Sequence, residues 1–143
     1  MTVNTHCNRH NDDHRGGYSS SCAHIIGLLF AIYVDGILSR LVNNKLGCSL
    51  GNIRLGYIMY ADDLILMASS LTMIQEMIKI CEMEADDNID MVFNASKSMV
   101  LRIGNHFNQT CTPVNVGGNN IPFVLKAKYL GFYICAAKFF KVS

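Results

Sequence analysis

The sequence predicts an α+β domain in which an antiparallel sheet, built from hairpins, is packed by two helices. Three observations lead to this fold class. Half of the 143 residues are hydrophobic and 16% are charged, which is enough apolar material for one core. Two stretches, residues 25–42 and 72–86, repeat apolar side chains at three- and four-residue steps, as helices do. After residue 52, short apolar runs alternate with turn residues, as strands in hairpins do.

The first 24 residues form a polar arm, which we expect to be mostly loop and which need not be ordered. Its spacing Cys7-x2-His10-x3-His14 matches no closed zinc pattern, so a solvated His-rich arm is the simpler interpretation. The longest charge-free apolar run, residues 25–34, is about half of the roughly 20 residues that span a bilayer. We therefore expect an intracellular protein, cytoplasmic or nuclear, without signal peptide, transmembrane segment or membrane partner, and with free thiols at its six cysteines.

Two helices are expected from the apolar periodicity. The first covers residues 25–42 and stops at Asn43, Asn44 and Gly47, with a core face of Ile25, Leu28, Leu29, Ile32, Tyr33, Ile37 and Leu41. The second begins at a capping box formed by Thr72 and Gln75. Its core stripe consists of Ile74, Ile78, Cys81 and Ala85.

The strands are expected in hairpins. Residues 53–59 and 64–68 flank a turn at residues 60–63, and residues 89–93 and 99–103 flank a turn at 94–98. Residues 114–116 and 121–124 flank a Gly-Gly-Asn-Asn turn, where Pro122 makes the second arm an edge strand. Residues 129–134 form the last strand.

The turn Tyr60-Ala61-Asp62-Asp63 places two adjacent carboxylates between apolar runs. Ionised aspartate is seldom buried without a partner, because its desolvation is costly. A pair of carboxylates at this position therefore predicts a metal-binding turn.

With its apolar arms, this turn resembles the signature turn of reverse transcriptases. The surrounding segments resemble, in the same order, those of non-LTR retrotransposon RNA-directed DNA polymerases: residues 28–35, the helix after the turn, and residues 93–98, 121–123 and 128–131. The resemblance divides the chain into an N-terminal arm (1–24), a partial reverse transcriptase palm domain (25–134) and a C-terminal tail (135–143).

In that family the palm joins a nucleotide to a primer 3′ hydroxyl, using two metal ions about 3.5–4 Å apart. The resemblance implies Mg²⁺ or Mn²⁺ as cofactor, and a dNTP and an RNA or DNA template-primer as partners. It makes Asp62 the main metal ligand and Asp63 the second carboxylate, and it places Tyr60 near the primer terminus. Lys97 would lie near the triphosphate; the alternative is a solvated turn lysine. Tyr129, Leu130 and Gly131 would hold the primer through their backbone.

The chain also departs from the family pattern. The family takes a third carboxylate from an earlier apolar strand, whereas the acids before Asp35 are Asp12 and Asp13, in a polar segment. The nucleotide-pocket loop is replaced by residues 19–27. We therefore expect a polymerase fragment that is inactive on its own. The alternatives are a non-catalytic nucleic-acid-binding or regulatory remnant of a retroelement, and a decayed reading frame without a selected role. A sheet lacking its earlier strand would expose an edge, through which the chain could self-associate.

Overall fold

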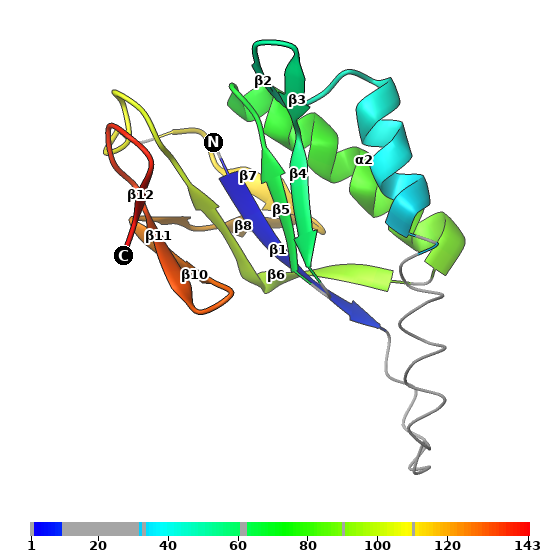
Figure 1. The fold of residues 1–143 in the computed structure, drawn as a ribbon. Helices are drawn as coiled ribbons and strands as arrows, with labels where there is room; N and C mark the ends of the chain where they lie inside the picture. Colours follow the sequence, from blue (N-terminus) through cyan, green and yellow to red (C-terminus); the bar gives the residue numbers. More distant parts are fainter. Residues whose placement is uncertain (1, 10–31, 33, 61–62, 90, 110) are drawn as a thin grey trace.

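The computed structural model describes residues 2–9, 32, 34–60, 63–89, 91–109 and 111–143. It has an α+β fold with two helices in the described residues and several small, mostly antiparallel sheets, which confirms the fold class at this level (Figure 1). The main sheet has the strand order β4-β5-β1-β6-β9. Its strands are β1 (Thr2–Arg9), β4 (Tyr57–Tyr60), β5 (Asp63–Met67), β6 (Met91–Leu101) and β9 (Phe123–Val124).

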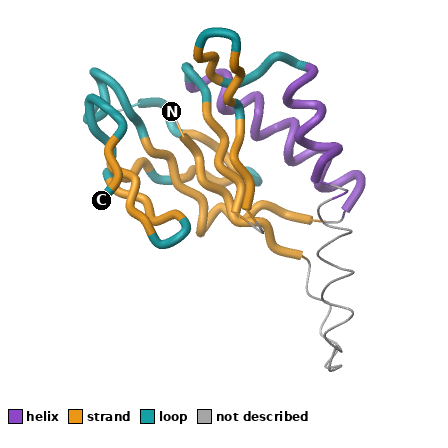
Figure 2. Tube along the Cα trace, viewed as in Figure 1, coloured by secondary structure: helices purple, strands orange, loops and turns teal. Residues whose placement is uncertain are grey.

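Three smaller sheets surround the main one. They are the hairpin of β2 (Cys48–Leu50) and β3 (Ile53–Leu55), the hairpin of β7 (Val114–Val116) and β8 (Asn119–Ile121), and the sheet of β10 (Lys126–Tyr129), β11 (Phe132–Cys135) and β12 (Lys141–Val142). The helices are residues 34–43 and α2 (Leu71–Ile89). Both helices lie on one side of the main sheet, and β10–β12 lies at the side away from them (Figures 1 and 2).

The core fills the space between the main sheet and the helices. All four residues of the predicted α2 stripe (Ile74, Ile78, Cys81 and Ala85) are buried, and so is Met77. They pack against Leu64 and Leu66 of β5 and Val114 and Val116 of β7. In the described part of the chain, no helix is both long and apolar enough to cross a membrane. Cys48, Cys81, Cys111 and Cys135 are free thiols, as expected.

The first helix is confirmed over its described part, but one of its predicted core positions is wrong. Ile37 and Leu41 are buried, whereas Ile32 is 61% exposed and Val34 is buried instead. Val34, Ile37 and Leu41 follow three- and four-residue steps. Ile32 stands five residues before Ile37, so it is rotated off the buried face. The earlier positions from 25 to 31, and Tyr33, lie outside the described residues.

The first helix ends in a Schellman motif. The Leu46 N–H donates to the Leu41 carbonyl (3.3 Å) and the Lys45 N–H donates to the Val42 carbonyl (3.0 Å). Lys45 adopts the left-handed conformation (φ 57°) that this motif requires. Leu41 and Leu46 are both buried, which is the apolar contact that accompanies such an end.

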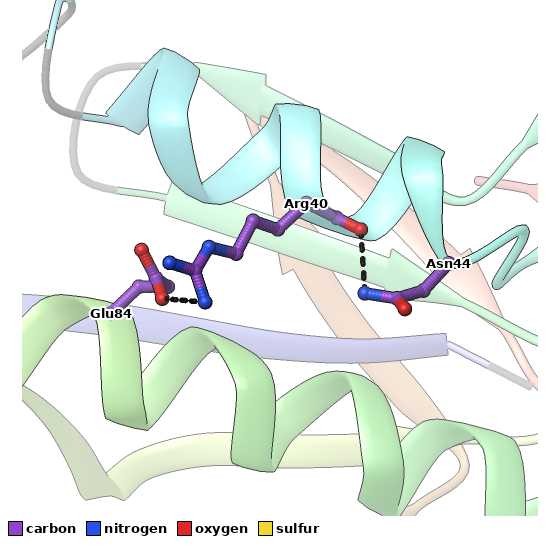
Figure 3. A network of polar contacts seen from close by, with 3 residues as sticks. All are labelled: Arg40, Asn44 and Glu84. Carbon is purple, nitrogen blue, oxygen red and sulfur yellow. Dashed lines mark hydrogen bonds and ion pairs between the residues drawn. The ribbon is translucent and has the colours of Figure 1, made fainter.

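An ion pair and a helix-end hydrogen bond lie where the two helices meet (Figure 3). Arg40 Nη1 lies 2.7 Å from Glu84 Oε1, and the Glu84 side chain is only 10% exposed. Asn44 Nδ2 donates to the Arg40 carbonyl (2.9 Å). The ion pair therefore joins the first helix to α2, with the Arg40 side chain largely exposed and Glu84 largely buried.

The predicted strand at residues 53–59 is interrupted at Gly56. Residues before it belong to β3, which pairs with β2, and residues after it belong to β4, which pairs with β5. The backbones of Gly47 and Gly56 come close together there, and a Cβ built on Gly47 would overlap the Gly56 Cα. This contact separates two strands that the sequence predicts as one.

The N-terminal arm, which the sequence predicts to be mostly loop, contains a strand, because residues 2–9 form β1. This strand pairs antiparallel with β5 on one side and with β6 on the other. The expectation of a sheet that lacks an earlier strand is therefore wrong. The sheet still has open edges in its described part, at β4 and β9. The His/Cys positions from His10 to Cys22 lie outside the described residues.

The segment after α2 is one strand rather than two strands about a turn. Residues 91–94 and 99–101 of β6 both pair with β1, and the register shifts between them. Residues 95–98 are therefore looped out as a bulge. Asn94 shapes it, because its Oδ1 accepts from the Ser96 N–H (3.0 Å) and the Lys97 N–H (3.3 Å), as in an Asx turn.

The predicted capping box at Thr72 is also wrong. Ser70 caps α2, since its Oγ accepts from the Met73 N–H (3.2 Å). Gln75 instead bonds both backbone groups of Asn115: Nε2 donates to the carbonyl (2.9 Å), and Oε1 accepts from the N–H (2.8 Å). Gln75 thus fastens α2 to β7.

Two further predictions change in detail. Residues 114–121 form the predicted hairpin, but its turn is Gly117-Gly118 alone, both with positive φ, and the residues after Pro122 form β9, parallel to β6. The predicted strand 129–134 is a hairpin, in which β10 and β11 are joined by Leu130 (φ 47°) and Gly131 (φ 85°). These φ values are those of a type I′ turn, which matches the twist of the strands.

Candidate functional site

β4 and β5 pair antiparallel, in agreement with the predicted hairpin, and they are called the acidic hairpin below. Its last described pair is Tyr60 opposite Asp63. Because alternate residues of a strand point to opposite faces, Ile58, Tyr60, Asp63 and Ile65 share one face, and Leu64 and Leu66 face the core. The site face is therefore the face of the sheet away from α2. Ala61 and Asp62 lie outside the described residues.

Tyr60 and Asp63 differ in their surroundings. The Tyr60 side chain is 61% exposed, so it is available to a ligand. Asp63 is half-buried and its Oδ1 atom is buried. The chain thus holds one carboxylate oxygen at the base of the turn and leaves an aromatic ring in solvent beside it.

Tyr129 comes from the C-terminal hairpin and lies near Asp63. Burial raises the pKa of Tyr129 above its usual value of 10.0, and the negative charge of Asp63 raises it further. The Tyr129 hydroxyl is buried and has no hydrogen-bond partner among the described residues. The structure therefore brings two of the predicted site residues, Asp63 and Tyr129, into one neighbourhood, with a side-chain interaction where the sequence predicts backbone contacts.

Leu130 and Gly131 occupy the turn beyond Tyr129. Both have positive φ, and the Leu130 side chain is 48% exposed. Their backbone closes the β10–β11 hairpin and holds Tyr129 opposite Phe132. The turn thus fixes the end of β10, where Tyr129 lies.

Lys97 lies in the bulge of β6 and its side chain is exposed. No hydrogen bond or ion pair found in the described part of the chain joins it to Asp63 or Tyr129. The Lys97 backbone N–H donates to Asn94 Oδ1 in this bulge, and both interpretations of its side chain stay predictions.

The described residues contain no complete set of ligands for a metal ion. Within them, no three His, Cys, Asp or Glu side chains are grouped so that they could hold a metal ion. The strand next to Asp63 is β1, whose sequence contains no Asp or Glu and whose register puts His6 opposite Asp63. The described part thus offers Asp63 as a single hard carboxylate, which does not make a Mg²⁺ site without further oxygen ligands.

A cavity that the sequence does not indicate lies away from the acidic hairpin. It has a volume of about 250 Å³ and is mainly apolar, with Arg102 as its charged group. The lining residues are Arg102, Phe107, Asn108, Gln109, Cys111, Phe123, Val124 and Leu125. The Arg102 guanidinium is already engaged, donating to Cys111 Sγ and to the Gln109 carbonyl (3.4 Å).

The charge of the chain is divided between its two parts. All eleven acidic residues lie in the first 90 positions, whereas six of the twelve basic residues follow without any acid: Lys97, Arg102, Lys126, Lys128, Lys138 and Lys141. The net charge of +1 conceals this division, and the position of the last acid, Asp90, is the signal that could have revealed it. The final 53 residues therefore form a positively charged part of the molecule.

Comparison of the chain with protein-family models, with curated proteins and with solved structures finds no match in any of the three.

Proposed function

We propose that this chain corresponds to part of the palm of an RNA-directed DNA polymerase of the non-LTR retrotransposon type, and that it has little or no polymerase activity alone. The observation that carries the proposal is the acidic hairpin, with Tyr60 paired to Asp63 at the end of two apolar strands. In a palm, such a hairpin brings carboxylates to the end of a sheet, where two metal ions bind the primer hydroxyl and the triphosphate.

The order of elements around the hairpin supports this proposal. A helix follows the hairpin and packs behind it, and the β10–β11 hairpin reaches back to the acidic residues through Tyr129. Two segments that lie far apart in the sequence thus meet at Asp63, as the proposed palm requires. Mg²⁺ or Mn²⁺ bound by Asp62 and Asp63 would supply charge stabilisation of the pentavalent phosphate.

The composition of β1, the strand beside the acidic hairpin, supports the proposal that the chain has little or no polymerase activity. In this family an earlier strand supplies the third carboxylate, whereas β1, which pairs with β5 of the acidic hairpin, carries no acid. Loss of one member of a catalytic constellation commonly reduces kcat by several powers of ten. Asp63 and Asp62 could therefore bind a metal ion without sustaining nucleotidyl transfer.

Metal binding and activity are tested separately. Mn²⁺ added to the ¹⁵N-labelled chain should broaden the amide signals of residues beside the hairpin, such as Tyr60 and Leu64. The variant carrying Asp62→Asn and Asp63→Asn should lose this broadening, whereas Asp35→Asn, an exposed acid on the first helix, should retain it. Absence of broadening at the hairpin in the unsubstituted chain would overturn the metal site.

Primer extension on a poly(rA)–oligo(dT) substrate with Mg²⁺ or Mn²⁺ tests the inactive state. We expect no extension above that of the Asp62→Ala variant. Extension that this substitution abolishes would show an active polymerase. The coding sequence on either side of the reading frame provides an independent test, since polymerase motifs continuing there would support a palm, and their absence would count against it.

A further inference from the structure

We propose that the outer face of the β10–β12 sheet binds single-stranded nucleic acid. The face consists of Lys126, Lys128, Tyr133 and Lys141, and is called the lysine face below. This proposal rests on the proposed function and adds a ligand surface to it. Binding at the lysine face requires neither metal ions nor the acidic hairpin.

The strand register places these four side chains on one face. Lys128 is opposite Tyr133, Lys126 is opposite Cys135, and Cys135 is opposite Lys141. Directly opposed residues of antiparallel strands point to the same side, and so do residues two apart in one strand. Lys126 and Lys141 therefore flank the middle strand, about 10 Å apart at a strand spacing of roughly 5 Å, with Tyr133 and Lys128 in the next row.

Contacts and exposure agree with this register. The Lys126 ammonium lies 4.2 Å from the centroid of the Tyr133 ring, which requires both side chains on one side of the sheet. The three lysines are exposed and the Tyr133 side chain is 40% exposed. The backbone of Tyr133 is held on both groups by Ser143, with N···O distances of 2.8 and 2.9 Å. The Tyr133 ring is thus exposed on a hydrogen-bonded strand and is surrounded by the lysine side chains.

The loop before β12 also combines exposed aromatic rings with a lysine. Phe139 and Phe140 are 75% and 67% exposed, and the Lys138 ammonium lies 5.7 Å from the Phe139 ring centroid. Exposed aromatic rings alternating with lysines are what a single strand requires, because its unpaired bases stack on the rings while its phosphates meet the cations. A duplex keeps its bases stacked internally, so it gains less from exposed rings.

Charge complementarity selects nucleic acid as the occupant. Phosphate groups attract the lysines, and the last 53 residues, which include this sheet, contain no Asp or Glu. An uncharged apolar partner would gain nothing from Lys126, Lys128 and Lys141. A polyanion without bases would gain nothing from Tyr133.

The test measures binding of the full chain to fluorescent dT15 and rU15 oligonucleotides by anisotropy, in EDTA and at several salt concentrations. The variant Lys126→Gln/Lys128→Gln/Lys141→Gln should lower the magnitude of the slope of log K against log salt by about 2, since each phosphate contact on a single strand contributes about 0.7. The control Lys45→Gln/Arg54→Gln/Lys79→Gln removes the same charge from exposed positions elsewhere and should leave the slope unchanged. Equal losses in both triple variants would show attraction by net charge alone and overturn the proposal.

Stacking is tested on Tyr133. Tyr133→Leu should weaken binding about fivefold or more at constant salt, whereas Tyr133→Phe keeps the ring and should bind like the unsubstituted chain. Equal affinity of both variants, or heparin or a duplex bound as tightly as dT15, would overturn the single-strand assignment. The Asp62→Asn/Asp63→Asn background should retain the difference between the two triple variants, so that a failure of the metal site and a failure of the lysine face give different results.

Discussion

The contact between Gly47 and Gly56 leaves no space for a side chain. A Cβ on Gly47 would overlap the Gly56 backbone, and Gly47 also has a φ of +112°. We predict that Gly47→Ala lowers the free energy of unfolding by about 2 kcal/mol or more, because the clash adds to backbone strain. Gly51→Ala is the control, since Gly51 (φ +61°) has open space around it and should lose about 1 kcal/mol. Urea denaturation measures both, and equal losses would contradict a specific backbone contact.

Tyr129 makes stability depend on pH in the alkaline range. Its pKa is raised in the folded state, by burial and then by Asp63, so below pH 10 the tyrosine is neutral whether folded or unfolded. Above pH 10 the unfolded chain releases the proton more readily, so the free energy of unfolding falls as pH rises through the folded-state pKa. We predict that Tyr129→Phe removes part of this fall in urea denaturation between about pH 9 and 11.

The control for this prediction is Tyr60→Phe, at an exposed tyrosine in the same neighbourhood. This variant should follow the pH dependence of the unsubstituted chain. Asp63→Asn should reduce the fall, because it removes the second cause of the raised pKa. A Tyr129→Phe profile parallel to that of the unsubstituted chain would show that Tyr129 does not contribute.

Individual residues could be predicted where the cause is local. Two acids between apolar arms predict a hairpin with Tyr60 and Asp63 at its end, and the register agrees. The approach of Tyr129 to Asp63 could not be predicted, because it depends on how two hairpins far apart in the sequence pack. The contact between Gly47 and Gly56 was missed for the same reason.

At the scale of elements, Gln75 joins α2 to the β7–β8 hairpin. Its amide bonds both backbone groups of Asn115 in a partly buried place. We predict that Gln75→Leu lowers the free energy of unfolding by about 1–3 kcal/mol, because it leaves a backbone donor and acceptor unsatisfied. Glu76→Ala, at the next and exposed position of the helix, should change it by less than about 0.5 kcal/mol. Similar losses in the two variants would contradict the fastening role.

The end of the first helix gives a stabilising prediction. Lys45 holds a left-handed conformation that costs an L-residue about 1 kcal/mol, which glycine avoids. Lys45→Gly should therefore raise the free energy of unfolding by about 0.5 kcal/mol, after the larger backbone entropy of glycine in the unfolded chain is deducted. Lys79→Gly, inside α2, should lower it by about 1 kcal/mol. Thermal unfolding followed by circular dichroism distinguishes the two signs.

Elements were predictable where periodicity is strong. The buried stripe of α2 follows directly from Ile74, Ile78, Cys81 and Ala85. The continuity of β6 was not predictable, since residues 94–98 carry the composition of a turn and only pairing to β1 keeps both sides in one strand. β1 itself lacks an apolar pattern, and its partners lie more than 50 residues away. Pairing between strands so far apart cannot be predicted from the local sequence of either strand.

At the scale of the whole molecule, β4 leaves an open edge. Within the described sheet it pairs with β5 alone, and its Ile58 side chain is 45% exposed. We predict self-association through this edge, and we expect Ile58→Lys to weaken it about tenfold or more by adding charge to the strand. Met83→Lys, at a 63% exposed position on α2, should leave it unchanged. Sedimentation velocity measures the association; a monomer at every concentration would contradict the prediction.

The position of β1 has a consequence for biosynthesis. β1 lies in the middle of the main sheet, although both of its neighbours follow it in the chain: β5 begins at Asp63 and β6 ends at Leu101. The ribosome must therefore add about ninety residues after β1 before this strand has both neighbours, and such distant pairing closes slowly. During that interval the nascent segment has no sheet to join. Occupancy by chaperones during translation should be highest before β6 emerges, and removal of residues 2–9 should separate the sheet into a β4–β5 hairpin and a β6–β9 pair.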